Sequence, residues 1–198
     1  MTEFSHYQEV TLIEQPEISL GVIWQKFYMQ LHLALADYRT RNGICSIGVS
    51  FPEYQSERFP LGTKLRIFGT SKEALEEFNL MGWISQLGDY VHITKFPREI
   101  PWKGVTSYAI FSRKEVKTNP DRLARRRIKR NPSIPFEEAL YHAQKIVKKC
   151  HLPYVNMRSL TSKRDFKLFI EKNEVEKLDV QLDFSSYGLS KGSAVPIF

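Results

Sequence analysis

Cysteine is scarce in this 198-residue chain, which has only Cys45 and Cys150, each in an apolar neighbourhood. Two isolated cysteines supply neither a disulfide framework nor a zinc site, so we expect both to be buried, reduced thiols. No basic segment leads into an apolar run near the N-terminus, and no run is long enough to span a bilayer. This pattern predicts a cytoplasmic protein with no signal peptide and no membrane partner.

The chain also lacks a cluster of acidic residues with the spacing of a two-metal nuclease. His6, His92, His142 and His151 form no pattern of metal ligands. Metal sites need several carboxylate, thiolate or imidazole groups that converge on one point. The sequence therefore predicts no metal ion and no other cofactor.

Positive charge, by contrast, is abundant, and it is concentrated in the second half of the chain. The formal net charge is +7, and residues 1–100 contain 9 Lys and Arg against 12 Asp and Glu. Residues 101–198 contain 20 Lys and Arg against 10 Asp and Glu. Such asymmetry is typical of a polyanion-binding module on a neutral scaffold. RNA, DNA and anionic lipid all fit this charge, as does a merely soluble basic surface.

The first half alternates between strand and helix patterns. Apolar and β-branched runs predict strands at residues 7–13, 45–51, 64–68 and 90–94. An apolar stripe at helical spacing predicts a long helix that Ser19 caps and Asn42-Gly43 ends, and Ser71 is expected to cap a second helix. The order βαββαβ is the split-βαβ pattern. We therefore predict the α+β class, with an N-terminal ferredoxin-like domain over residues 1–97.

A domain boundary is expected where Pro97, Pro101 and Gly104 interrupt both periodicities, since the charge balance changes at the same place. Residues 98–198 are then expected to form a basic α+β domain. It begins with a strand-like segment at residues 106–111.

An arginine-rich helix is expected at about residues 120–130, with Asn119 as N-cap and Pro120 in the first helical position. Basic side chains at helical spacing share one face: Arg122, Arg125, Arg126, Lys129 and Arg130. Leu123, Ala124 and Ile128 lie on the opposite side, which is expected to dock. Like charges this close repel one another, so the pattern favours a polyanion beside the helix over a solvated charged face. The phosphate-lined major groove of an A-form RNA stem fits this requirement.

Segments along nearly the whole chain resemble one protein family. They are QLHLAL (30–35), IGVSFP (47–52), LG with LRI (61–67), FSRKEVKTNP (111–120), LPYV with RS (152–159), FKLFI (166–170), and YGLSKG with VP and F (187–198). In these segments the chain resembles the type I-F CRISPR repeat-processing endoribonucleases. The resemblance implies a ferredoxin-like domain followed by a domain whose arginine-rich helix enters the major groove of the CRISPR repeat RNA hairpin.

The resemblance also implies roles in reading that hairpin. Arg113 and Glu115 match an Arg and a Gln that read the lowest base pairs of the stem. Arg113 keeps the fork that recognises guanine. Glu115 replaces the glutamine, and because a carboxylate cannot donate to adenine N7, the base that it reads is left open. Phe166 matches an aromatic residue that stacks on the terminal base pair, although its residue type alone favours burial in a core.

The catalytic residues that the resemblance implies are His32, Ser159 and Tyr187. His32 would take the proton of a ribose 2′-OH, which attacks the neighbouring phosphorus and leaves a 2′,3′-cyclic phosphate and a 5′-OH without a metal. Ser159 would hold the ribose for attack, and Tyr187 would support His32 or the scissile phosphate. Residue type alone favours structural roles instead: a half-buried histidine at the surface, a serine that caps a helix, and a tyrosine packed in the fold.

Alternative functions remain open for a hairpin-binding chain of this kind. The expected enzyme matures crRNA, retains the product hairpin and joins the other subunits of a type I-F crRNA-guided surveillance complex. The alternative is a catalytically silent or single-turnover hairpin-binding subunit of that complex. A DNA-binding protein is less favoured, because a B-form duplex lacks the 2′-OH and the A-form stem geometry.

Overall fold

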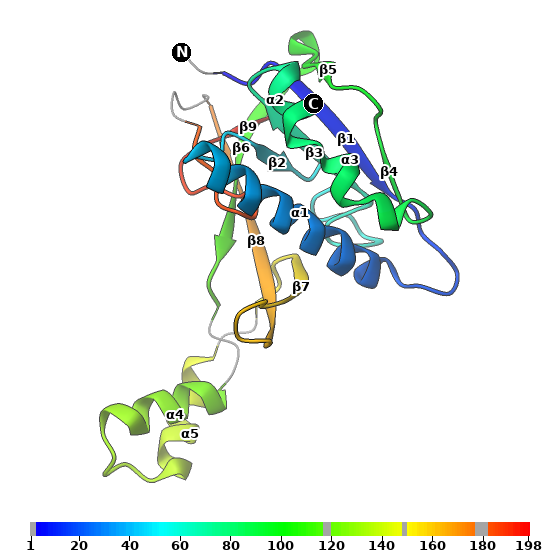
Figure 1. Ribbon diagram of the computed structural model, residues 1–198. Helices are drawn as coiled ribbons and strands as arrows, with labels where there is room; N and C mark the ends of the chain where they lie inside the picture. The colour runs from blue at the N-terminus through cyan, green and yellow to red at the C-terminus, as the bar shows by residue number, and fades with distance from the viewer. Residues whose placement is uncertain (1–2, 117–119, 148–149, 177–181) are drawn as a thin grey trace. The chain divides into compact units, whose positions relative to one another are not determined.

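The computed structural model describes residues 3–116, 120–147, 150–176 and 182–198. The chain divides into two compact units, one made of Met1–Arg113 and Pro153–Phe198 and the other of Lys114–Leu152. Helices and antiparallel strands in the first unit confirm the α+β class (Figure 1). This unit contains residues from both sides of the boundary expected near residue 97. That boundary stays a prediction, because packing does not test which segments fold independently.

The first sheet has the strand order β2-β3-β1-β4, and β5 also pairs with β1. Its antiparallel strands are β1 (His6–Leu12), β2 (Gly48–Ser50), β3 (Lys64–Gly69), β4 (Val91–Ile93) and β5 (Arg98–Glu99). Val10 lies opposite Leu65 on one side and Ile93 on the other, so buried side chains of three strands share one face. All four predicted strands are present, although the one expected at 45–51 is shortened to β2.

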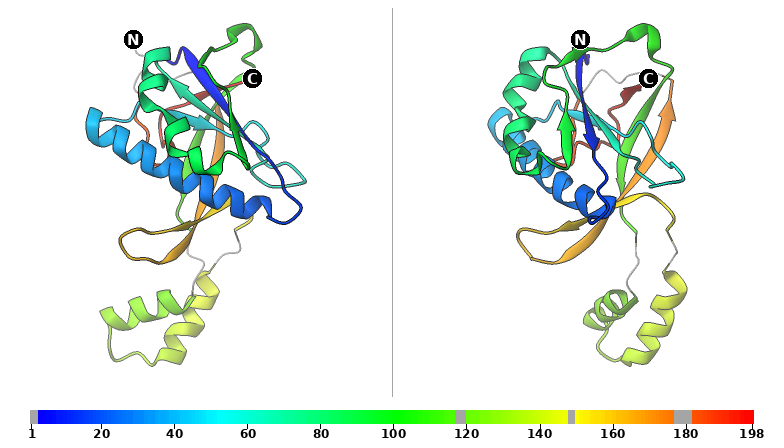
Figure 2. Two further views of the ribbon diagram at one scale, coloured as in Figure 1. Left: turned by 45° about the vertical axis from the view of Figure 1, so that its right-hand side comes forward. Right: turned by 90° about the vertical axis from the view of Figure 1, so that its right-hand side faces the viewer.

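Three helices cover one face of this sheet: α1 (Leu20–Asn42), α2 (Lys72–Phe78) and α3 (Leu80–Trp83) (Figures 1 and 2). Ser19 is the N-cap residue of α1, as predicted. Its side chain makes no capping hydrogen bond, however, so the expected stabilisation of the helix by its hydroxyl was wrong. Ser71 does cap α2, because its hydroxyl accepts from the amide of Ala74. Gly43 ends α1 at φ 78°, as predicted. Short 3-10 helices occupy Ser85–Leu87 and Trp102–Gly104.

The second sheet has the strand order β7-β8-β6-β9. Its strands are β6 (Ser107–Lys114), β7 (Tyr154–Arg158), β8 (Asp165–Val175) and β9 (Val195–Ile197). The strand predicted at 106–111 is therefore confirmed and extends to Lys114. Strands β7 and β8 form a hairpin in which Met157 lies opposite Phe166, and β7 packs against α1.

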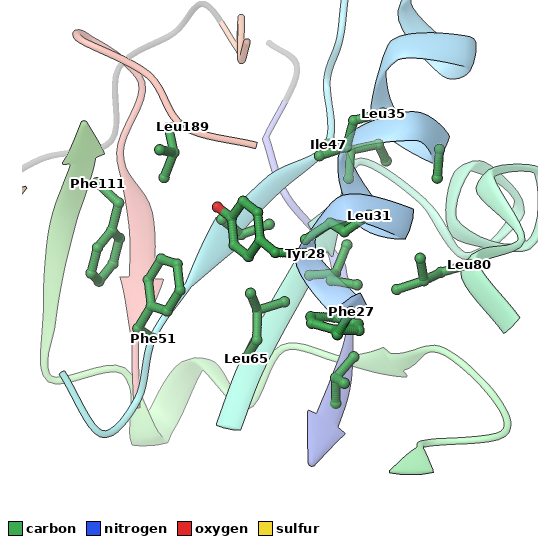
Figure 3. Close-up of a cluster of buried hydrophobic side chains, with 14 of the residues drawn as sticks. Phe27, Tyr28, Leu31, Leu35, Ile47, Phe51, Leu65, Leu80, Phe111 and Leu189 are labelled. Carbon is green, nitrogen blue, oxygen red and sulfur yellow. The ribbon is translucent and has the colours of Figure 1, made fainter. Parts of the chain in front are cut away.

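One hydrophobic core joins the two sheets of the first unit (Figure 3). The rings of Phe51, which follows β2, and Phe111 of β6 have centroids 5.3 Å apart. Tyr28 and Leu31 of α1 belong to the same core, and so does Leu189 near the end of the chain. The two halves of the sequence therefore stabilise a common core, which fixes α1 relative to the segment around Leu189.

The two cysteines have different surroundings. Cys45 is a buried free thiol, as expected, and burial raises its pKa to about 11. Cys150 is also free but only half-buried, so the expectation of burial was wrong for this residue. None of the helices in the described ranges is both long and apolar enough to cross a bilayer.

The second unit is a pair of packed helices, α4 (Pro120–Arg130) and α5 (Phe136–Ile146). Its small core consists of Ala124, Ala139 and Ala143, against which Leu123 and Ile128 pack. The expected helix and its docked apolar side are thus confirmed. The N-cap predicted at Asn119 lies outside the described residues.

Candidate functional site

His32 lies near the middle of α1 and is half-buried. Its Nδ1 atom is 2.7 Å from the carbonyl oxygen of Ser186. A carbonyl oxygen can only accept a hydrogen bond, so Nδ1 must carry the hydrogen. In the neutral ring Nε2 then keeps its lone pair, and it has no hydrogen-bond partner among the described residues. This arrangement presents a proton acceptor at the surface of α1.

The ring of Tyr187 stacks on the ring of His32, with centroids 4.3 Å apart and an interplanar angle of 8°. The main chain of Tyr187 is held by α1 as well, because the hydroxyl of Tyr28 donates a hydrogen bond to the carbonyl oxygen of Tyr187 over 2.9 Å. Burial raises the pKa of Tyr28, and the nearby Tyr187 adds to this, so the Tyr28 hydroxyl stays protonated and remains a donor. Two contacts from α1 therefore fix the segment that holds the imidazole.

Gly188 allows this segment to lie against β2 and α1. Its φ is +70°, and a Cβ atom placed there would lie 2.6 Å from Cγ1 of Val49. Its carbonyl oxygen accepts from the amide of Val49 over 3.1 Å. A glycine is required because the backbone is left-handed and the approach is close. The turn positions Ser186 and Tyr187 over His32.

Arg113, near the end of β6, extends the cluster through a contact with Tyr187. Its guanidinium carbon lies 5.6 Å from the ring centroid of Tyr187 and 5.4 Å from that of Phe166. Both distances are within the range of cation–π attraction. The structure thus brings together four residues singled out in the sequence: His32, Tyr187, Arg113 and Phe166. Phe166 is half-buried and packs against the core, so its ring is partly accessible.

Ser159 follows β7 in the turn of the β7–β8 hairpin. Its hydroxyl oxygen accepts from the amide of Ser162 over 3.1 Å, a contact that stabilises the turn, since no helix begins here for Ser159 to cap. Strand alternation places Ser159 on the same hairpin face as Met157 and Phe166. Within the described ranges Ser159 makes no contact with His32, so the structure does not join these two predicted catalytic residues directly.

The basic face expected in the second unit is exposed along α4: Arg122, Arg125, Arg126, Lys129 and Arg130. In the part of the chain that the structure describes, the last four of these form no ion pair. Arg127, which lies off this face by helical spacing, is exposed as well. Glu115 is also exposed.

Two groups of the site were missed by reasoning from the sequence. The carbonyl of Ser186 gives no sequence signal, because any residue can supply a carbonyl. Tyr28 gives a weak signal, because a tyrosine in an otherwise apolar helical stripe needs a partner for its hydroxyl.

The fold and the site define an α+β protein in which a histidine with one open ring nitrogen stacks on the tyrosine of an arginine–aromatic cluster. The family model described as CRISPR-associated protein (Cas_Csy4) matches residues 7–198. The chain belongs to this family, which confirms the resemblance found in the sequence.

Two relatives match over nearly their full lengths. One is the CRISPR-associated endonuclease Cas6/Csy4 of Escherichia coli (strain UTI89 / UPEC), 34% identical over 197 residues that cover 98% of this chain and 99% of the relative. The other is the CRISPR-associated endonuclease Cas6/Csy4 of Pseudomonas aeruginosa (strain UCBPP-PA14), 33% identical over 194 residues, again with 98% and 99% coverage.

Proposed function

We propose that this protein is an endoribonuclease that cuts CRISPR repeat RNA at the base of its hairpin to produce mature crRNA. The relatives are named as endonucleases, and the exposed cations of α4 suit an RNA stem. The observation that carries the proposal is the geometry of His32, whose Nδ1 is held by a carbonyl while Nε2 is open. A strand order of β2-β3-β1-β4, with helices after β1 and β3, further supports a ferredoxin-like arrangement of residues 1–97.

The proposed reaction uses the RNA's own nucleophile. Nε2 of His32 takes the proton of the ribose 2′-OH, and the oxygen forms a bond to phosphorus as the bond from phosphorus to the 5′ oxygen breaks. The departing oxygen takes up a proton, so the products are a 2′,3′-cyclic phosphate and a 5′-OH. This route requires no metal ion and no other cofactor.

Ser159 and Tyr187 have positioning roles in this proposal. The oxygen of Ser159 already accepts a hydrogen bond, but its O–H remains available to orient the reacting ribose. Tyr187 holds the imidazole plane by stacking, while its hydroxyl, which has no partner among the described residues, can contact the scissile phosphate.

RNA recognition is assigned to residues of both units. The basic face of α4 grips the stem in its major groove, Arg113 reads a guanine near the base of the stem, and Glu115 accepts from an exocyclic amine. Phe166 stacks on the terminal pair. Because Phe166 contacts Arg113, the ring that stacks on the terminal pair lies beside the side chain that reads the guanine. The protein then retains the product hairpin as a subunit of a cytoplasmic type I-F crRNA-guided complex.

The test combines a modified substrate with two histidine variants. A 2′-deoxy nucleotide at the cut should abolish cleavage and leave binding nearly intact, and EDTA should change neither. His32→Ala should slow cleavage by about 10² to 10⁴, the range for losing a general base, with near-native affinity. His92→Ala is the matched control, because His92 is exposed on β4, and it should cut normally.

Normal cutting of the deoxy substrate, or full activity of His32→Ala, would show that His32 does not activate a ribose nucleophile. If the wild-type protein binds the hairpin but never cuts it, the chain is a binding subunit instead.

A further inference from the structure

The β7–β8 hairpin has a second face that the proposed function does not use. Residues 158–167 contain four Lys and Arg and a single acid, Asp165. Exposed side chains at its turn and outer face form what we call the hairpin patch: Tyr154, Arg158, Lys163, Arg164 and Lys167. The patch belongs to the first unit, on the hairpin labelled β7 and β8 in Figure 1.

The cations of this patch are available to an anion. Arg158, Lys163 and Arg164 form no ion pair with any described residue, even though Arg158 lies opposite Asp165 in the strand register. Lys167 is held over the ring of Tyr154, with Nζ 4.1 Å from the centroid. Tyr154 is 38% exposed, and its ring packs on Phe169 at 5.4 Å between centroids. The patch therefore combines a partly exposed aromatic ring, which Phe169 and Lys167 contact, with three cations that form no ion pair among the described residues.

Strand alternation places Tyr154, Arg158 and Lys167 of this patch on the outer face of the hairpin, opposite to the inner face that contributes to the candidate site. Tyr154 and Arg158 are exposed on β7, whereas Val155 and Met157 between them are buried. Ser159 and Phe166 lie on the inner face of the same hairpin, with Met157. The turn at residues 160–164 follows Ser159 directly, so it connects the inner face of the hairpin to the outer face.

We propose that the hairpin patch binds the single-stranded RNA that flanks the stem across the scissile phosphate. This inference rests on the proposed function and extends its substrate beyond the hairpin. Single-strand sites combine an aromatic ring for a base with cations that follow the backbone, and the patch has both. A protein partner is less suited to it, because the centres of protein interfaces are depleted of lysine.

Two RNAs test the proposal with the full-length protein. One is the stem-loop that ends at the cut, and the other carries about six further nucleotides of single strand, with a 2′-deoxy nucleotide that prevents cleavage. The hairpin-patch variant is Lys163→Asn, Arg164→Ser and Lys167→Ser, where asparagine suits the φ of +55° at position 163. The matched control, Lys95→Ser, Arg98→Ser and Lys103→Ser, removes the same charge from exposed positions of the same unit.

The extension should strengthen wild-type binding roughly tenfold, the order expected for one stacked base with a few phosphate contacts. The gain should vanish in the hairpin-patch variant and persist in the control, while the stem-loop alone binds all three proteins equally. Tyr154→Leu, which keeps an apolar contact with Phe169, should remove part of the gain.

Three results would overturn the inference: no gain in the wild type, a gain that survives in the hairpin-patch variant, or equal losses on both RNAs. If the wild type still binds and cuts the hairpin in any of these cases, the proposed function is retained and only the inference about the flanking strand is lost. If it binds neither RNA, the proposed function itself fails.

Discussion

The orientation of His32 depends on a backbone conformation that one glycine makes possible. Gly188→Ala would place a methyl group 2.6 Å from Cγ1 of Val49 and 3.3 Å from Cδ1 of Leu35, at a φ of +70°. We expect it to lower the free energy of unfolding by about 1–3 kcal/mol, from backbone strain and displacement of the core. Because Ser186 and Tyr187 would move with it, cleavage should slow under conditions in which the variant remains folded. Urea unfolding and single-turnover cleavage measure the two effects.

Gly192→Ala is the control for this prediction, because a Cβ atom at position 192 meets nothing within 4 Å and the φ is not positive. It should unfold and cleave as the wild type does. A Gly188→Ala protein with native stability and rate would show that the turn is not needed to place His32.

The residue types of the site were accessible from the sequence, but their contacts were not. His32 and Ser186 are 154 positions apart, and their link is made through a main-chain carbonyl, which no side-chain pattern reports. Arg113 was assigned to RNA through the resemblance, whereas its packing between Phe166 and Tyr187 required the folded second sheet. The roles of His32, Tyr187, Arg113, Phe166 and Ser159 all stay predictions.

Among the elements, strands β1 and β3 are joined by an ion-pair cluster that predicts a pH effect. Burial of Glu9 acts to raise its pKa, but hydrogen bonds and attraction from Arg66 and Lys64 outweigh this and lower it below 4.5. A lowered pKa in the folded state means that the carboxylate stabilises the fold above about pH 4.5 and stops doing so as the pH falls through the lowered value.

Glu9→Gln should therefore be less stable than the wild type at neutral pH, and the two should converge in acid. Unfolding free energies measured across this range check it. Glu57→Gln, which alters an exposed carboxylate with no ion pair among the described residues, should show no such convergence. A constant difference at every pH would assign the loss at Glu9 to packing rather than charge.

The basic face of α4 predicts how hairpin binding depends on salt. Replacing Arg125, Arg126, Lys129 and Arg130 by Ala should weaken binding strongly and flatten the plot of log K against log salt by up to about one unit per lost phosphate contact. Arg127→Ala, which removes an exposed charge from another side of the helix, should flatten it less than Arg126→Ala does. An unchanged slope in the quadruple variant would rule out α4 as the stem-binding element.

The ends of helix α4 were easier to predict than those of strand β2, for a physical reason. The α4 helix runs from Pro120 to Arg130 as expected, because a cap position, a proline and a 3.6-residue period all marked it. The apolar run at 45–51 predicted too long a strand, since Cys45 and Ile47 are buried in the core without extending the ladder of β2. Strands β8 and β9 both pair with β6, which lies far from them in the sequence, and local patterns do not show such pairings.

At the scale of the whole molecule, the uneven charge predicts how often the enzyme turns over. With 20 Lys and Arg against 10 Asp and Glu in residues 101–198, the product hairpin should be held by many phosphate contacts. With substrate in excess at low salt, we expect a fast phase of about one cut per protein followed by a slow phase set by product release.

Raising the salt from about 50 to 200 mM should speed the slow phase roughly tenfold or more, because a protein with several phosphate contacts loses orders of magnitude in affinity over this range. The fast phase should change little while substrate remains saturating, since the proton transfer proposed for His32 does not depend on those contacts. Quenched-flow measurements at the two salt concentrations separate the phases. A single phase of many turnovers at low salt would mean that the product leaves freely, and a slow phase indifferent to salt would mean that a step other than release of the phosphate contacts limits turnover.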